Sequence, residues 1–114
     1  VAWLQRTALA AFAPRAAAYA TRLGLGPPPV ALSSARARWG SCTANGRIRL
    51  AWRLVHVTPH LADYVISHEV AHVVEPNHSR RFWRVVESMY ADFRDARREL
   101  RLAGATIPLI EGLP

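Results

Sequence analysis

Apolar residues recur at helical spacing in the first part of the chain, roughly from Trp3 to Leu23. The segment is rich in alanine, and its larger apolar residues are Leu4, Leu9, Phe12, Tyr19 and Leu23. This pattern predicts a helix, which Pro14 is expected to kink or restart because proline lacks the N–H that a helix interior needs. Gly24 and Gly26, followed by the run Pro27–Pro29, then end the helix and form a stiff connector.

The pattern changes to strict alternation between Arg47 and Leu54. One face carries Ile48, Leu50, Trp52 and Leu54, and the other carries Arg47, Arg49 and Arg53. A second alternating run covers Ala35–Trp39, and Thr43–Gly46 between the two runs is a good hairpin connection, because Asn-Gly tolerates positive φ. The stretch Val30–Leu54 therefore predicts a small, mostly antiparallel three-stranded sheet with one apolar face.

Helical spacing returns after Thr58, which is expected to cap a helix that has Pro59 in its first position. Its apolar stripe comprises Leu61, Val65, Ile66, Val70 and Val73, and Pro76 is expected to stop it. A second stripe follows with Phe82, Val85, Val86 and Met89. A further short helix is expected over about 92–102, and an irregular docked segment after Gly104.

Composition places the chain among globular proteins, with 51% hydrophobic and 20% charged residues in a length of 114. We expect one domain, 1–114, and leave open whether it is the C-terminal catalytic part of a longer protein. The lone Cys42 excludes an internal disulfide and suits a reducing, cytoplasmic compartment. No signal peptide or membrane span is expected, because Arg6, Pro14 and Arg15 interrupt the apolar N-terminal stretch.

The formal net charge is +7, and all 15 basic residues are arginines. One interpretation is a GC-rich genome, since alanine and proline are also plentiful. The other is an anionic partner such as nucleic acid, nucleotide or phosphate, which the planar fork of arginine binds well. The predicted arginine face of the sheet (Arg36, Arg38, Arg47, Arg49 and Arg53) is either such a platform or an ordinary solvated strand face. Oligomeric state is left undetermined.

The central motif is His68-Glu69-Val70-Ala71-His72, which lies in the middle of a predicted helix. Residues four apart on a helix are separated by about 40° and roughly 6 Å, so both imidazoles can reach one ion. Glu69 points to the side and can act as the base that accepts a proton from water, without being a ligand. The pattern predicts a hydrolytic site with one zinc ion.

Catalytic zinc needs a third protein ligand. His78 is the leading candidate, because it follows His72 by six residues and Pro76 breaks the helix between them. Glu75 is the rival, at the end of nearly the same helix face. Glu87 and Glu99 could reach in from later helices, although nothing in the sequence favours either.

Several motifs in order resemble one known family. They are Ala35-Arg36-Ala37-Arg38-Trp39-Gly40-Ser41-Cys42, the run Gly46–Leu54, Pro59 with Asp63-Tyr64-Val65, the His68–His72 motif, and Asn77-His78-Ser79 with Phe82-Trp83. Over about 12–102 the chain resembles the YgjP-like predicted metal-dependent hydrolases, which are relatives of the SprT-like (Spartan) metalloproteases. The resemblance implies an α+β, minimal zincin-like fold, with His68, His72 and His78 as ligands and Glu69 as the catalytic residue.

The remaining candidates concern substrate contacts and the surroundings of the metal. Arg38 and Tyr64 are the candidates for binding substrate, and Tyr64 or His60 is the candidate for stabilising an oxyanion. Cys42 is either a buried small residue or an inhibitory fourth metal ligand. Trp39, Trp52 and Trp83 are expected in the core, and Asn77 and Ser79 are expected to hold the corner or cap the next helix.

Three functions fit these residues. The favoured one is a zinc metallopeptidase that acts on a protein or peptide. The resemblance also implies hydrolysis of a nucleotide, since a YgjP-like protein has been assigned hydrolysis of UTP. The third is a non-catalytic, metal-stabilised module that binds nucleic acid, which the presence of Glu69 disfavours because ligation alone does not require it.

Overall fold

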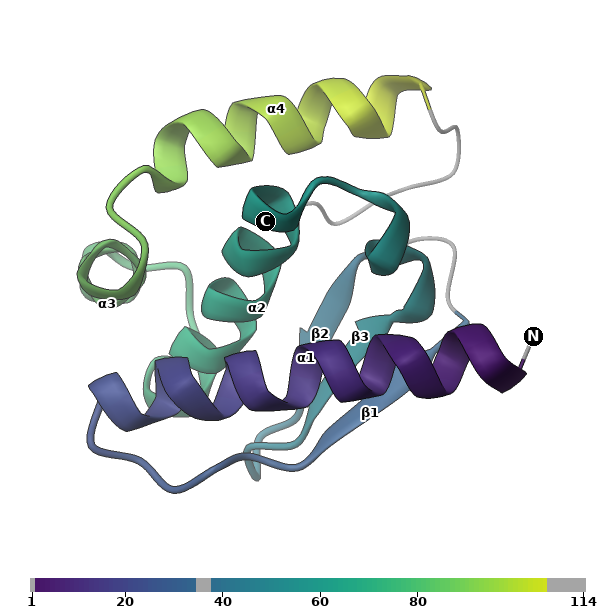
Figure 1. Cartoon of the computed structure of the whole chain (residues 1–114). Helices are drawn as coiled ribbons and strands as arrows, with labels where there is room; N and C mark the ends of the chain where they lie inside the picture. The colour runs from purple at the N-terminus through teal and green to yellow at the C-terminus, as the bar shows by residue number, and fades with distance from the viewer. Residues whose placement is uncertain (1, 35–37, 107–114) are drawn as a thin grey trace.

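Helix α2 (Pro59–Val74) lies at the centre of the fold, in contact with the sheet and with the helices that precede and follow it (Figure 1). The computed structural model describes residues 2–34 and 38–106. The elements, in chain order, are α1 (Ala2–Arg22), β1 (Val30–Ser33), β2 (Gly40–Cys42), β3 (Ile48–Ala51), the 3₁₀ helix η1 (Trp52–His56), α2, α3 (Arg80–Met89) and α4 (Phe93–Thr106). This α+β order, with an N-terminal helix, a small sheet and C-terminal helices, confirms the expected fold class.

Helix α2 is buried on all sides over Tyr64–Ala71. The predicted apolar stripe is buried from Leu61 to Val70, whereas Val73 is half-buried. Burial extends round the whole helix because α1, the sheet, α3 and α4 all contact it. A helix enclosed in this way carries its polar side chains into the interior, and His68 and Glu69 are among them.

The boundaries of α2 follow the predicted signals. Thr58 takes the N-cap position with extended backbone, although its hydroxyl makes no capping hydrogen bond. Its carbonyl accepts instead from Leu61 N at 3.0 Å and Ala62 N at 3.1 Å. The helix ends at Val74, two residues before Pro76, as expected.

The sheet is mixed, with strand order β1-β3-β2. Strand β2 pairs antiparallel with β3 through the predicted hairpin, in which Thr43 N donates to Arg47 O at 2.8 Å and Gly46 has φ +84°. Strand β1 pairs parallel with β3, so the expectation of a mostly antiparallel sheet holds for one of the two pairings. The chain passes from β1 at one edge to β2 at the other edge before it returns through β3 in the middle, so β3 runs parallel to β1 and antiparallel to β2.

The predicted alternation is confirmed over Ile48–Leu50 and fails beyond Ala51. Ile48 and Leu50 are 1% and 0% exposed and point inward, while Arg49 is exposed. The chain then turns into η1 because Leu54, which is fully buried beside α1, is brought inward by the tighter helical geometry. Trp39 is buried, as predicted for the core, whereas Trp52 lies in η1 and is only half-buried.

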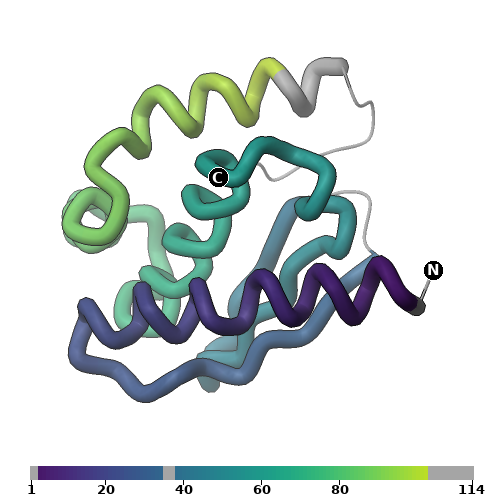
Figure 2. The backbone as a smooth tube through the Cα atoms, in the orientation of Figure 1, coloured from purple at the N-terminus to yellow at the C-terminus, as the bar shows by residue number. Residues whose placement is uncertain are grey.

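Helix α1 runs through Pro14 as one continuous helix (Figure 2), so the expected restart at this residue does not occur. Pro14 and Ala10 are both exposed, so the carbonyl that proline leaves unpaired faces water. The buried face consists mostly of small residues: Ala8, Phe12, Ala16 and Ala20. Leu9, expected in the apolar stripe, is 37% exposed.

Helices α3 and α4 complete the core. Ser79 caps α3 by accepting from Phe82 N at 3.3 Å, and Phe82, Val86 and Met89 are buried. Helix α4 packs on α2 and extends to Thr106, further than predicted. Of the helices described, none is long and apolar enough to cross a membrane.

Candidate metal centre and active-site cavity

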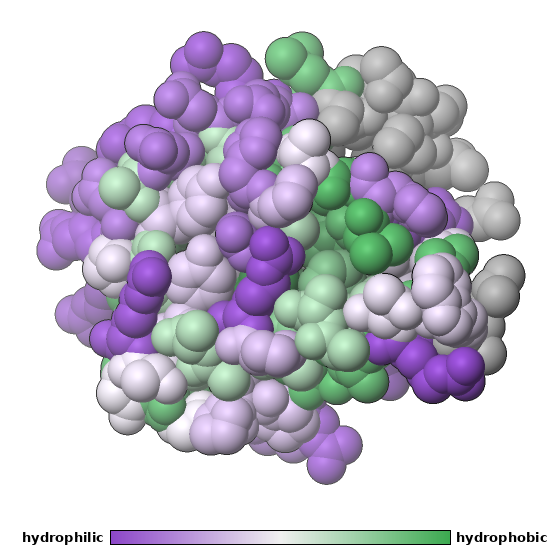
Figure 3. Space-filling model, viewed as in Figure 1, coloured by the Kyte–Doolittle hydropathy of each residue, from purple (hydrophilic) through white to green (hydrophobic). Residues whose placement is uncertain are grey.

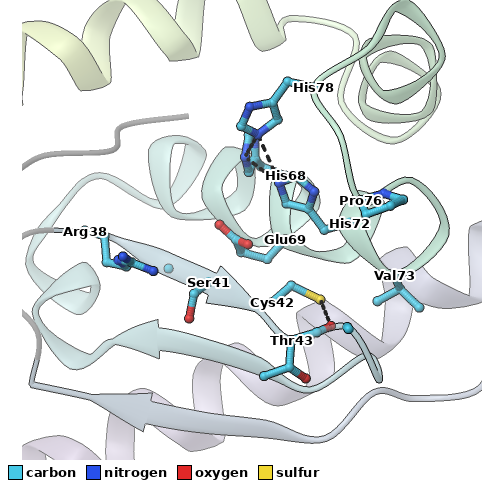
Figure 4. A pocket seen from close by; sticks show the side chains of 12 residues that line it. Arg38, Ser41, Cys42, Thr43, His68, Glu69, His72, Val73, Pro76 and His78 are labelled. Atoms are coloured by element: carbon cyan, nitrogen blue, oxygen red, sulfur yellow. Dashed lines mark hydrogen bonds between the residues drawn. The ribbon is translucent and has the colours of Figure 1, made fainter.

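Three histidines converge at the surface of α2 (Figure 4). His68 and His72 lie one turn apart on the helix, and the corner after Pro76 brings His78 back over them. The three Nε2 atoms are separated by 3.2 Å (His68–His72), 3.3 Å (His68–His78) and 3.1 Å (His72–His78). The three residues could hold a metal ion.

The spacing and protonation of these rings fit a metal ion. Tetrahedral zinc with Zn–N bonds of about 2.0–2.1 Å requires nitrogens about 3.3–3.4 Å apart, close to what is observed. Nδ1 of His72 donates to the Glu75 carbonyl at 3.1 Å, which leaves the lone pair of its Nε2 facing the other rings. Burial lowers the pKa of His68 to about 2 and also lowers that of His72. Neutral imidazoles of this kind are the form that ligates metals.

Phe82 and Trp83 pack the histidines from α3. The Phe82 ring is stacked on His72 at 4.5 Å and also contacts His68 and His78, at 4.9 Å each. Trp83 lies 5.8 Å from His68 and 5.9 Å from His78. The apolar spacing of α3 predicted Phe82 as core. Its role of orienting the three imidazoles depends on how α3 docks, which no local pattern reveals.

Glu69 lies beside the histidines and is 4% exposed. Its side chain rests against β2: a Cβ built on Gly40 would lie 3.0 Å from Glu69 Cγ and 3.2 Å from Oε2. Burial raises the pKa of Glu69 to about 8, while the Arg38 guanidinium acts in the opposite direction. No local pattern in the sequence predicts the contact of Gly40 with Glu69, because it joins segments far apart in the chain.

A cavity of about 720 Å³ joins these groups. Its walls come from α2, the corner and β2, and the lining includes His68, Glu69, His72, Val73, Pro76, His78, Arg38 and residues 40–44. Cys42 lies in this wall and is half-buried; burial raises the pKa of its thiol to about 11, and the Glu69 carboxylate adds to the rise. Arg38, a predicted substrate contact, is exposed at the rim.

Comparison with known families agrees with this arrangement. A family model described as YgjP-like, metallopeptidase domain matches residues 1–103. The chain belongs to the YgjP-like metallopeptidase family. It is therefore a metal-dependent hydrolase of a peptidase family.

A solved structure similar to this YgjP-like domain is the crystal structure of the metallopeptidase zymogen of Pyrococcus abyssi abylysin. The two share 20% identity and superpose with a TM-score of 0.71, over 86% of this chain and 96% of the other. At this identity the likeness is one of fold. No curated protein matched the sequence.

Other predicted candidates of the YgjP-like domain lie away from the cavity. Tyr64 is fully buried, contacts the His68 ring edge-on at 6.0 Å and does not line the cavity. Its hydroxyl and His68 Nδ1 are buried without hydrogen-bond partners among the described residues. Glu75 is not part of the histidine cluster, and its Oε1 accepts from Arg81 Nη1 at 3.3 Å.

The remaining acidic candidates and His60 are engaged elsewhere on the surface. His60 and Glu99 pair with each other at 2.9 Å, and Glu87 lies 3.6 Å from Arg94. None of these three candidates lines the cavity.

The predicted arginine face is divided among different parts of the fold. Arg36 lies outside the described residues. Arg47 and Arg49 are exposed, Arg53 is half-buried in η1, and none of these three lines the cavity.

Proposed function

We propose that this domain hydrolyses peptide bonds with one zinc ion held by His68, His72 and His78. The observation that carries the proposal is the triangle of Nε2 atoms, with sides of 3.1–3.3 Å, in the wall of a cavity that also contains Glu69. Three imidazoles suit zinc better than magnesium or calcium, which prefer oxygen ligands. When bound, the ion would act as a Lewis acid that acidifies water and polarises a carbonyl.

Glu69 acts as the general base in this proposal. Its carboxylate lines the cavity beside His68 and His72, where it can accept the proton of the attacking water and pass it to the leaving amine. A general base works best when its pKa lies near the working pH, and burial raises the pKa of Glu69 towards that range. Contact with Gly40 supports one position of the carboxylate against the strand.

The peptide lies along β2. This strand is at the edge of the described sheet and forms the wall of the cavity opposite the histidines. An extended peptide can pair with such an edge through main-chain hydrogen bonds, which fix the position of its carbonyls beside the strand. Cys42 is paired with Ile48, so its side chain lies on the same face of the sheet, and Gly40 is paired with Leu50 and presents only backbone there.

The cavity favours a peptide over a nucleotide. Among the described residues that line it, Arg38 is the one arginine, whereas a triphosphate requires several cationic contacts. Arg47 and Arg49, which the nucleotide hypothesis relied on, do not line the cavity.

The test compares the zinc-loaded chain with its Glu69→Gln variant. Metal content is measured by mass spectrometry, and cleavage is followed on a mixed library of quenched fluorescent peptides. We expect the variant to keep its metal and lose turnover by about 10³-fold or more, because it retains the shape but loses the base. Glu75→Gln, which changes a carboxyl group at the end of the same helix but outside the cavity, is the matched control and should remain active.

Two results would contradict the proposal. Undiminished cleavage by Glu69→Gln would remove the residue from the mechanism. Pyrophosphate release from UTP that depends on Glu69, with no peptide cleaved, would identify a nucleotide hydrolase instead.

A further inference from the structure

A second groove, of about 440 Å³, lies between α3 and α4. Its lining residues are Arg80, Trp83, Arg84 and Glu87 from α3, with Phe93, Arg94 and Arg97 from α4. The α3 residues recur at the spacing of one helix face, so the two helices present facing rows. The surface over α3 and α4 is mainly hydrophilic (Figure 3).

The groove carries an excess of positive charge. It contains four arginines and one carboxylate, Glu87, whose Oε2 lies 3.6 Å from Arg94 Nη1. Arg80 and Arg84 are exposed, and neither has a carboxylate partner within the part of the chain that the structure describes. The position of Glu87 shows that a carboxylate can lie among these guanidinium groups.

Two aromatic rings form the floor and hold the α4 arginines in place. Trp83 and Phe93 are stacked, with centroids 5.5 Å apart and an angle of 19° between their planes. Arg97 lies over Trp83 at 4.8 Å and Arg94 over Phe93 at 4.7 Å. A guanidinium stacked in this way keeps its N–H donors at the edge, where they can bind carboxylates in pairs. The rings are already covered, so they do not offer the open stacking surface that a nucleic-acid base requires.

One side chain, that of Trp83, separates the groove from the histidine cluster and contacts both. Trp83 lines the groove and also contacts His68 and His78, at 5.8 and 5.9 Å. An extended peptide advances about 3.3–3.6 Å per residue. A substrate that extends past Trp83 from the histidine cluster would enter the groove.

We propose that the α3–α4 groove is a substrate-binding site that takes acidic side chains of the peptide, so that the enzyme prefers acidic segments near its cleavage site. This inference rests on the proposed peptidase function. Three observations support it: the excess of guanidinium groups, the lack of a carboxylate partner for Arg80 and Arg84 among the described residues, and the contact of Trp83 with two of the histidines. Glu or Asp residues in the substrate would pair with Arg80 and Arg84.

Binding and cleavage are tested separately, so that failure of one can be told from failure of the other. The binding arm uses zinc-loaded Glu69→Gln protein and fluorescence anisotropy with two labelled peptides, one with four consecutive glutamates and one with glutamines in their place. We expect the glutamate peptide to bind about tenfold more tightly at low salt, with the advantage shrinking as salt is added. Combining Arg80→Gln with Arg84→Gln should remove most of that advantage. Arg47→Gln with Arg49→Gln, an equal charge change on the exposed sheet face, should preserve it.

Equal affinity for the two peptides, or equal losses in the two double variants, would overturn the proposal. A single-stranded oligonucleotide that binds more tightly than the glutamate peptide, and loses affinity in the groove variant alone, would overturn it in favour of nucleic acid. In the cleavage arm, wild-type protein that cuts neither peptide would count against the peptidase function, while the binding arm would still decide what the groove binds.

Discussion

Gly40 lies directly against Glu69, so that the backbone of an edge strand supports the carboxylate of the candidate base. A Cβ on Gly40 would come within 3.0 Å of Glu69 Cγ, and within 3.2 Å of both Glu69 Oε2 and the Arg49 carbonyl oxygen. The last of these atoms belongs to the neighbouring strand and cannot move aside freely. The position of the carboxylate therefore depends on the absence of a side chain at Gly40.

Replacing Gly40 with alanine should displace Glu69 without affecting the histidines. We expect kcat/KM for peptide cleavage to fall about 100-fold, since misplacing a catalytic group by about 1 Å costs that much. Bound zinc should be unchanged by mass spectrometry. Gly26→Ala, at a glycine with no atom within 4 Å of the added carbon, is the control. Full activity in Gly40→Ala would mean that the carboxylate does not need this support.

Removing His78 should weaken the metal site sharply. In His78→Ala we expect zinc affinity, measured by competition with a chelator, to fall by more than the 10–100-fold typical of losing a residue that only supports a ligand. Glu75→Gln should bind zinc normally, because the Glu75 side chain pairs with Arg81 and its hydrogen bond with His72 is made by the backbone carbonyl, which the substitution keeps. The reverse pattern would give the third-ligand role to Glu75.

The Tyr64 hydroxyl should be dispensable. It is buried without a partner among the described residues and does not line the cavity, so Tyr64→Phe removes a costly group and keeps the ring against His68. We expect the free energy of unfolding in urea to stay the same or rise by about 1 kcal/mol. Activity should remain within about twofold of wild type. A large loss of activity with normal stability would revive the role of Tyr64 in stabilising an oxyanion.

Cys42 should resist alkylation at neutral pH in the metal-free protein. Burial raises its pKa to about 11, so the folded state disfavours the reactive thiolate, which becomes abundant only as the pH approaches that value. The rate of reaction with iodoacetamide should keep rising up to about pH 11 in the folded chain. In urea it should level off near the ordinary thiol pKa of about 8.5. A native rate that levels off below pH 9 would show a stabilised thiolate, as expected of a metal ligand.

Pro14→Ala should stabilise the fold. The substitution restores a helical hydrogen bond in the middle of α1, and Pro14 is exposed, so no core contact is lost. We expect a gain of about 1–2 kcal/mol, because alanine is about 3 kcal/mol better than proline inside a helix but leaves the unfolded chain freer. Pro27→Ala, in the connector after α1, should lose up to about 1 kcal/mol in the same urea titration. A destabilised Pro14→Ala would mean that the proline ring itself contributes to α1.

Local sequence signals determined much of this protein. Thr58, Pro59 and Pro76 set the ends of α2, the Asn45-Gly46 pair set the hairpin, and the spacing of His68 and His72 placed two imidazoles one turn apart. Each signal acts within a few residues, where backbone geometry limits the outcome. Local signals failed at two places. Pro14 does not restart α1, because it lies on the exposed face of the helix, where the unpaired carbonyl meets solvent. Strand β3 is shorter than predicted, because the chain turns into η1 and buries Leu54 there.

Only the tertiary structure decided the parallel pairing of β1 with β3, the contact of Gly40 with Glu69, the packing of Phe82 on the histidines and the groove beside Trp83. These contacts join segments that are distant along the chain, and they depend on how whole elements dock. The periodicity of a sequence tells which face of an element is apolar. It does not tell which other element will cover that face, because that choice is made by packing over the whole core.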